Sequence, residues 1–157
     1  MDSSALYDSD FLAWTEDQAA ALRRHAAQRL NVDLDLEHLA EEIEDLGDNT
    51  VEVVEGAVTQ AIAHLLKLEW SPAVEPRGHW QDEVQGYRVR ARRRLRRSPS
   101  ARHRLDLADL YADARTLAAT ALARDGLDTT LLPATCPYAL DQVLDPAWWP
   151  RNRHDSD

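Results

Sequence analysis

Apolar residues recur at helical spacing along nearly the whole of this 157-residue chain. Between Leu36 and Leu46 they follow the i, i+3, i+4, i+7 pattern of a helix with one side facing a core. No segment sustains the alternation of apolar and polar residues that is typical of a half-buried strand. We therefore expect an all-α fold, a single-domain helical bundle of four or five main helices with a C-terminal strap.

Capping and turn residues divide this pattern into separate helices. We expect a first helix from about Asp10, a second from Asp35 and a third segment from Thr50. At Gly47 the second helix either stops, kinks or runs on, since glycine weakens a helix without always ending it. Two prolines and a glycine predict a linker at 71–79. Further helices are expected at 80–97, 99–121 and 137–144.

The length of the chain suits one domain, which we expect over residues 1–157, with a core at about 6–150 and a frayed polar tail at 151–157. No apolar run approaches the roughly 20 residues of a membrane span, and the acidic N-terminus does not resemble a secretory signal. The single cysteine, Cys136, has no internal disulfide partner. We therefore expect a cytoplasmic protein with no membrane partner.

Charge is distributed unevenly along the chain, whose formal net charge is −10. Residues 1–56 hold fifteen acidic residues and three arginines, whereas Tyr87 to Arg104 holds nine arginines and no acidic residue. Such segments either pair within the molecule or leave one of them for a partner. We expect internal pairing, with arginine–carboxylate pairs bordering the core, because the acidic partner is present in the same chain.

The arginine-rich segment Arg88–Arg104 has a second interpretation as a nucleic-acid contact. Guanidinium groups neutralise backbone phosphates, which makes some of these side chains candidate anion-binding residues. The candidates are Arg88, Arg92, Arg93 and Arg96. No helix-turn-helix or zinc knuckle accompanies them, and the overall acidity disfavours non-specific binding of nucleic acid by the whole molecule. A protein partner or a homo-oligomer is therefore favoured over a nucleic acid.

Carboxylates at the start of the second helix are a ligand type that iron, manganese and zinc accept. Glu41 and Glu44 are three residues apart and share a helix face. His64 joins them if the chain folds back after the second helix. These three residues are the candidate ligands of a divalent metal and define an alternative function, a metal-dependent or acid–base enzyme. The simpler interpretation is a solvated or arginine-paired flank, and no cofactor is expected.

Three residues are candidates for a catalytic role. His64 and Lys67 lie one turn apart and offer a proton-transfer group and an anion contact. Cys136, just before Pro137, offers a nucleophile at the start of an expected helix. Each residue also has a structural interpretation, as a hydrogen-bonded packing histidine, a lysine whose stem covers apolar surface and a small buried thiol. The structural interpretations are the expected ones.

Short strings of residues occur in a fixed order along the chain. They are YDSDFLAWT from Tyr7, AEEIEDLG from Ala40, HLLK from His64, SPS from Ser98, YADAR from Tyr111, CPY from Cys136 and WP from Trp149. Together, over roughly residues 6–150, they resemble a bacterial family of uncharacterised proteins, the one catalogued as domain of unknown function, family 29. The resemblance implies an all-helical bacterial cytoplasmic protein and implies no reaction, substrate or cofactor.

The leading prediction is therefore a non-catalytic cytoplasmic interaction or regulatory domain that self-associates through exposed helix faces or binds another protein. The first alternative is the enzyme that uses Glu41, Glu44 and His64. The second is a nucleic-acid-binding regulator that uses Arg88–Arg104.

Overall fold

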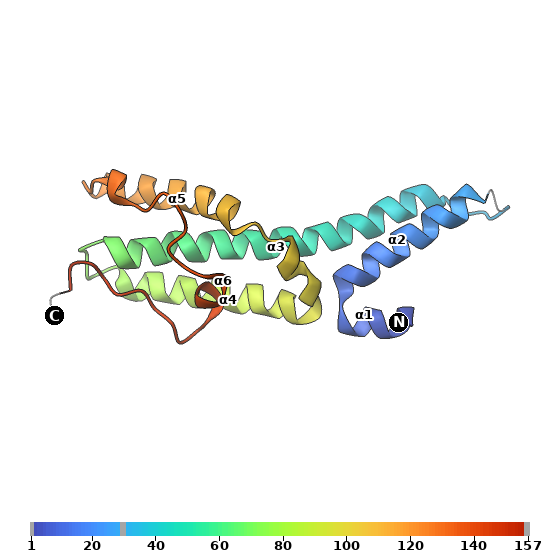
Figure 1. Ribbon diagram of the computed structural model, residues 1–157, viewed down its shortest axis with the longest axis horizontal. Helices are drawn as coiled ribbons and strands as arrows, with labels where there is room; N and C mark the ends of the chain where they lie inside the picture. The colour runs from blue at the N-terminus through green and yellow to red at the C-terminus, as the bar shows by residue number, and fades with distance from the viewer. Residues whose placement is uncertain (1, 29–30, 156–157) are drawn as a thin grey trace. The chain divides into compact units, whose positions relative to one another are not determined.

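The computed structural model describes residues 2–28 and 31–155, and their regular structure is helical throughout (Figure 1). The α-helices are α1 (Ser3–Ser9), α2 (Phe11–Ala27), α3 (Leu36–Trp70), α4 (Arg77–Arg97), α5 (Leu107–Arg124) and α6 (Leu140–Leu144). Short 3₁₀ helices form at η1 (Pro99–Arg104) and η2 (Thr129–Leu131). These ranges contain no strand, so the all-α prediction is confirmed.

Local capping explains several helix ends. The Asp10 carboxylate begins α2 by accepting from the backbone N–H of Ala13 at 3.1 Å. Asp106 begins α5 by accepting from the N–H of Ala108 at 3.0 Å. Beyond α5, Gly126 has a φ of +78°, the left-handed conformation that glycine adopts easily after a helix. The expected helix at 99–121 is thus wrong in its first turns, which form η1 before Asp106 starts a new helix.

α3 is one continuous helix of 35 residues, so the chain runs straight on through Gly47 (Figure 1). Gly47 is buried against α2. A Cβ at this position would overlap Thr15 Oγ1 and lie 3.0 Å from Leu12 Cδ1. The glycine therefore permits the close approach of two helices, and it does not interrupt α3.

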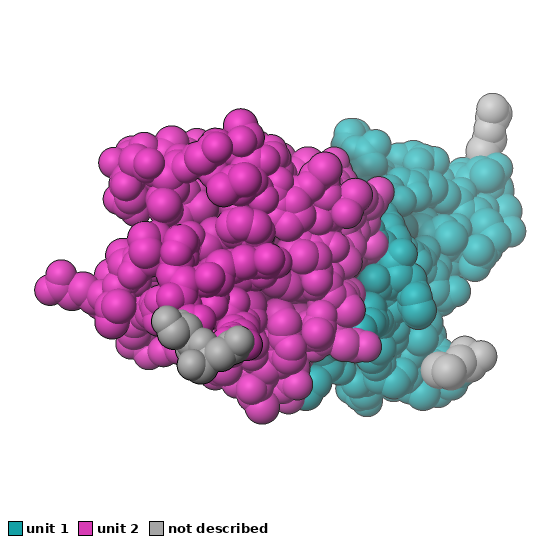
Figure 2. Space-filling view, turned by 60° about the vertical axis from the view of Figure 1, so that its left-hand side comes forward, with its two compact units in different colours: residues 1–54, 93–104 teal, residues 55–92, 105–157 magenta. Residues whose placement is uncertain are grey.

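The chain divides into two compact units (Figure 2). Unit 1 comprises residues 1–54 and 93–104. Its core contains Leu12 of α2, Val51 of α3 and Ala101 of η1, with the partly buried Leu95 of α4 packed against them. The Asp10 carboxylate links two elements of this unit, because it also accepts from the Ser100 backbone N–H and hydroxyl, each at 2.8 Å.

The buried side of α3 in unit 1 differs from the predicted apolar stripe. Leu39 and Leu46, expected to face the core, are 40% and 56% exposed. Small residues face inward in their place, including Ala40, Gly47 and Thr50. Because α2 approaches α3 closely at Gly47, this interface accommodates small side chains and leaves the leucines on the flank.

Unit 2 comprises residues 55–92 and 105–157. Its fully buried apolar residues come from α3, α4, α5 and α6, which shows that these helices share a core. They include Val58, Ile62, Leu65, Leu66, Val84, Ala114, Ala118 and Val143. In the described part of the chain, no helix has both the length and the apolar character needed to cross a membrane.

The end of the chain is packed, contrary to the expected fraying of residues 151–157. Asn152 is 6% exposed, and its Nδ2 donates to the carbonyls of Leu68 at 2.6 Å and Ser71 at 2.8 Å. These bonds satisfy carbonyls at the C-terminal end of α3 that lack a partner within the helix. Residues 156–157 of the predicted tail lie outside the described residues.

Candidate anion-binding site

Most exposed arginines of α4 have no partner in the described part of the chain. Arg92, Arg93, Arg94 and Arg96 are exposed, and none forms an ion pair or a hydrogen bond through its side chain with a described residue. The predicted internal pairing with the acidic start of α3 is therefore wrong for Arg93, Arg94 and Arg96, which belong to the same unit of the chain as that start. Like charges four apart on a helix, such as Arg92 and Arg96, destabilise it slightly, by about 0.2–0.5 kcal/mol per pair.

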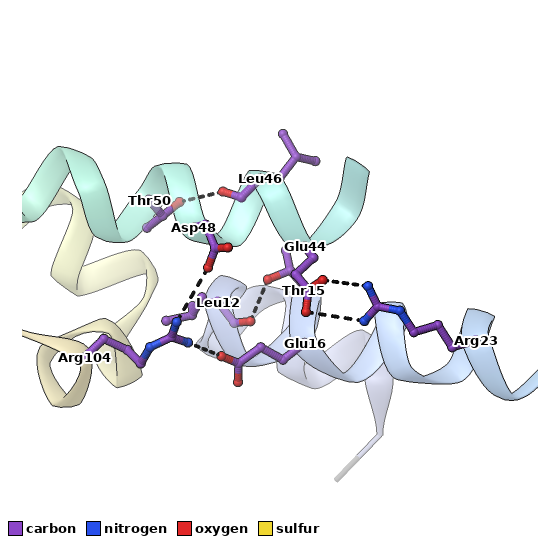
Figure 3. A network of polar contacts seen from close by, with 9 residues as sticks. All are labelled: Leu12, Thr15, Glu16, Arg23, Glu44, Leu46, Asp48, Thr50 and Arg104. Atoms are coloured by element: carbon purple, nitrogen blue, oxygen red, sulfur yellow. Dashed lines mark hydrogen bonds and ion pairs between the residues drawn. The ribbon is translucent and has the colours of Figure 1, made fainter. Parts of the chain in front are cut away.

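The carboxylates of unit 1 instead pair with arginines outside α4 (Figure 3). Arg23 of α2 donates two hydrogen bonds to Glu44, at 2.6 and 3.3 Å, and this contact lowers the pKa of Glu44. Arg104, at the end of η1, lies 2.7 Å from Glu16 and 3.6 Å from Asp48. These pairs stabilise the fold only weakly because solvent screens them, and they occupy acids that α4 was expected to use.

A pocket of about 200 Å³ lies beside Arg94 and Arg97 of α4, within unit 1. Its lining residues are Phe11, Leu46, Asn49, Thr50, Arg94, Arg97 and Ser98. The guanidinium of Arg97 lies 4.7 Å from the centre of the Phe11 ring, a cation–π contact that restrains it. None of the described residues that line the pocket carries a carboxylate, so their charged groups are both positive.

The residues that line this pocket include Ser98, whose hydroxyl is in an unusual environment. Its side chain is fully buried, and its hydroxyl has no hydrogen-bond partner among the described residues. The neighbouring Thr50 hydroxyl, by contrast, donates to the Leu46 carbonyl at 3.2 Å. Since buried polar groups are nearly always hydrogen-bonded, the Ser98 hydroxyl and the two guanidiniums define a site that has donors in excess. Sequence analysis missed Arg94, Arg97 and Ser98 because their convergence depends on how η1, α2 and α3 pack.

Arg88, predicted as an anion-binding residue, is instead a buried structural residue of unit 2. It is 1% exposed, and its Nε and one Nη donate at 2.8 Å to the carbonyls of Val143 and Trp148. Its guanidinium also lies 4.5 Å from the centre of the Trp149 ring. Burial lowers the pKa of this guanidinium. Arg88 thus holds the C-terminal segment against α4, and its other Nη is buried without a hydrogen-bond partner among the described residues.

His64 and Lys67 lie together in unit 2, beside α4. Nδ1 of His64 is 2.9 Å from the Gln60 carbonyl, and its ring centre is 5.7 Å from that of Tyr87. Lys67 Nζ lies 5.1 Å from the centre of the Trp80 ring. Burial lowers the pKa of both His64 and Lys67. The hydrogen bond of His64 is of the kind expected for a packing histidine, whereas the contact of Lys67 is a cation–π contact made by its ammonium group.

The three candidate metal ligands do not converge. Glu41, Glu44 and His64 lie on the same unbroken helix, α3, and the chain does not fold back between them. The 20 residues from Glu44 to His64 correspond to about 30 Å at the rise of an α-helix. Within residues 2–28 and 31–155, no group of three or more His, Cys, Asp or Glu side chains is placed to hold a metal ion.

Cys136, the candidate nucleophile, has a contact for its thiol within the chain. The half-buried Cys136 thiol lies 3.3 Å from the Tyr138 carbonyl, and burial raises the pKa of the thiol, which disfavours the thiolate.

A pocket of about 530 Å³ in unit 2 is lined in part by Glu69, Tyr138 and Arg153. The Glu69 carboxylate accepts from the Tyr138 hydroxyl at 2.6 Å and from Arg153 Nε at 3.0 Å. The Glu69 carboxylate and the Arg153 guanidinium in this pocket are therefore already paired.

Comparisons with known proteins agree with the fold. The family model described as "Domain of unknown function DUF29" matches residues 6–149. The crystal structure of an alpha-helical protein of unknown function from Rhodospirillum rubrum ATCC 11170 is similar, with 27% sequence identity, 90% of each chain covered and a TM-score of 0.80. No curated protein matches the chain. The comparisons confirm the predicted fold class and the family resemblance, and any function must be argued from the site.

Proposed function

We propose that this chain, which belongs to the family described as domain of unknown function DUF29, is a non-catalytic interaction domain that self-associates through charge. The observation that supports this proposal is the pair of exposed arginines Arg93 and Arg96 in unit 1, which have no partner among the described residues. They remain unpaired in a chain with a net charge of −10. A partner carboxylate would remove the repulsion between neighbouring guanidiniums.

A second copy of the chain supplies the complementary surface. Glu42 and Asp45, at the start of α3, are exposed and have no ion pair or hydrogen bond through their side chains with any described residue. Contact between the arginines of one copy and these acids of another joins two different patches, either head to tail or reciprocally about a two-fold axis. A nucleic acid is less favoured as the partner, because the net charge of the molecule repels it.

Sedimentation velocity over a range of protein concentrations tests this proposal. At low ionic strength the average mass of the wild-type protein should rise with concentration, and added salt should reverse the rise because it screens exposed charges. The double variant R93Q/R96Q should remain a monomer. R24Q/R124Q, which removes two exposed arginines elsewhere, is the matched control and should associate like the wild type.

Two results would overturn the proposal. One is a wild-type protein that stays monomeric at every concentration at low ionic strength. The other is tight binding to DNA or RNA in a gel-shift series, which weakens steeply with salt and is lost in R93Q/R96Q. That second result would assign the arginines to a nucleic acid.

A further inference from the structure

We infer that the pocket lined by Arg94, Arg97 and Ser98 binds the phosphate group of a small phosphomonoester. This inference does not depend on self-association, because neither Arg93 nor Arg96 lines the pocket. It depends on three features of unit 1, which are two uncompensated guanidiniums, a buried hydroxyl without an acceptor, and an apolar wall.

The guanidiniums supply the charge. Arg94 and Arg97 are three residues apart in the last turn of α4 and therefore project from neighbouring positions on one side of the helix. Neither forms an ion pair with a described carboxylate, and no carboxylate lines the pocket. The planar fork of donors on arginine matches the oxygens of a phosphate, so two such groups around one pocket favour a phosphate ligand.

One of the two guanidiniums is already restrained. Arg97 lies over the rings of Phe11, at 4.7 Å, and Tyr7, at 6.0 Å. A side chain held in this way loses little rotational freedom when a ligand binds, and preorganisation of this kind increases affinity. Arg94, whose side chain forms no hydrogen bond, ion pair or ring contact with a described residue, becomes ordered upon binding.

Ser98 supplies the second, independent observation. Its side chain is 0% exposed and its hydroxyl lacks an acceptor within the described chain. A donor buried in this way reduces stability unless an acceptor is present, and native proteins contain few such groups. Because Ser98 is among the lining residues, a phosphate oxygen bound in the pocket would supply the missing acceptor. The Asn49 side chain, which also lines the pocket, offers an amide donor to a further oxygen.

The charge and the wall of the pocket narrow the ligand class. A phosphomonoester carries about −1.5 to −2 charges near neutral pH and so balances two guanidiniums, whereas a carboxylate balances one. Phe11 and the 56% exposed Leu46 form the apolar part of the lining. This combination favours a phosphate that bears a small apolar substituent over inorganic phosphate alone.

Isothermal titration of the full chain at low ionic strength tests the assignment, with phenyl phosphate, inorganic phosphate and acetate as the probes. We expect saturable binding that is strongest for phenyl phosphate and weakest for acetate. R94Q, which changes an exposed side chain, should weaken phenyl phosphate binding about tenfold, or 1.4 kcal/mol. The matched control R93Q/R96Q, which removes two exposed arginines outside the pocket, should bind as the wild type does even though it no longer self-associates.

The variant S98A separates a ligand-binding hydroxyl from a structural one. Removal of a buried hydroxyl without a partner should raise the Tm of the ligand-free protein, and the same change should weaken phenyl phosphate binding. Three results would overturn the assignment: no saturable binding of any probe, equal loss of binding in R94Q and R93Q/R96Q, or an S98A protein that binds normally and melts at a lower temperature.

Discussion

The buried side chain of Arg88 stabilises unit 2 through its hydrogen bonds. Arg88 has no carboxylate partner, yet its hydrogen bonds to the carbonyls of Gln142, Val143 and Trp148 fasten the C-terminal segment. Its cationic form is tolerated in the interior because each carbonyl directs partial negative charge toward it, and the Trp149 ring covers one face. The residue would be read from the sequence as one more surface arginine.

Replacement of Arg88 by methionine should therefore be costly. R88M keeps an unbranched stem but leaves buried carbonyls without donors, so we expect the free energy of unfolding to fall by about 2–3 kcal/mol. R90M, two residues along the same helix, alters an exposed side chain and should change it by less than about 0.5 kcal/mol. Urea unfolding of both variants measures these changes. A similar loss in the two variants would show that Arg88 is not a structural residue.

His64 should make the stability of the protein depend on pH. Burial lowers its pKa in the folded state, so the folded protein binds a proton at this site less readily than the unfolded chain does. The associated stabilisation is fully present above the unfolded pKa of about 6.5 and is lost as the pH falls below it.

The variant H64Q isolates this effect, because carboxylates and the exposed His38 titrate in both proteins. The difference in unfolding free energy between wild type and H64Q should shift in favour of H64Q as the pH falls from about 7 to 5. Urea unfolding at several pH values measures this difference. A difference that stays constant over this range would contradict the account of His64.

Among the elements, α3 shows how one glycine sets the approach of two helices. Gly47→Ala places a Cβ against Thr15 and Leu12 of α2, and we expect a loss of about 1–3 kcal/mol despite the better helix propensity of alanine. Gly56, on the same helix, is exposed and has no atom within 4 Å of an added Cβ, so G56A should stabilise the protein by about 0.5–1 kcal/mol. Thermal unfolding of the two variants compares them directly. Stabilisation by both would mean that α2 and α3 are not in close contact at Gly47.

Local signals in the sequence predict some features of these elements and not others. The start of α2 at Asp10 and the turn at Gly126 were predictable because capping involves residues a few positions apart. The exposure of Leu46 was not, since it depends on the residues of α2 that face Gly47. In the candidate site, too, only some features can be predicted from the sequence. A cluster of arginines is visible in the sequence, but the pairing of Glu44 with Arg23 and the isolation of Ser98 arise only from tertiary packing.

At the scale of the whole molecule, the two charged segments pair only in part in the described chain, through Arg104 with Glu16 and Asp48. Glu44, Glu16 and Asp48 find arginines outside α4, whereas Arg93 and Arg96 find none. The central claim is that carboxylates of a second copy complete these pairs. If so, each molecule contributes both an arginine patch and an acidic patch to its contacts with other copies.

A mixing experiment tests this claim most directly. The variants R93Q/R96Q and E42Q/D45N each retain one of the two complementary patches, so each alone should sediment as a monomer at low ionic strength. An equimolar mixture should form a heterodimer, in which the intact arginines of one variant meet the intact acids of the other, and salt should dissociate it. A mixture that sediments as two monomers, while the wild-type protein associates, would show that these patches do not bind each other.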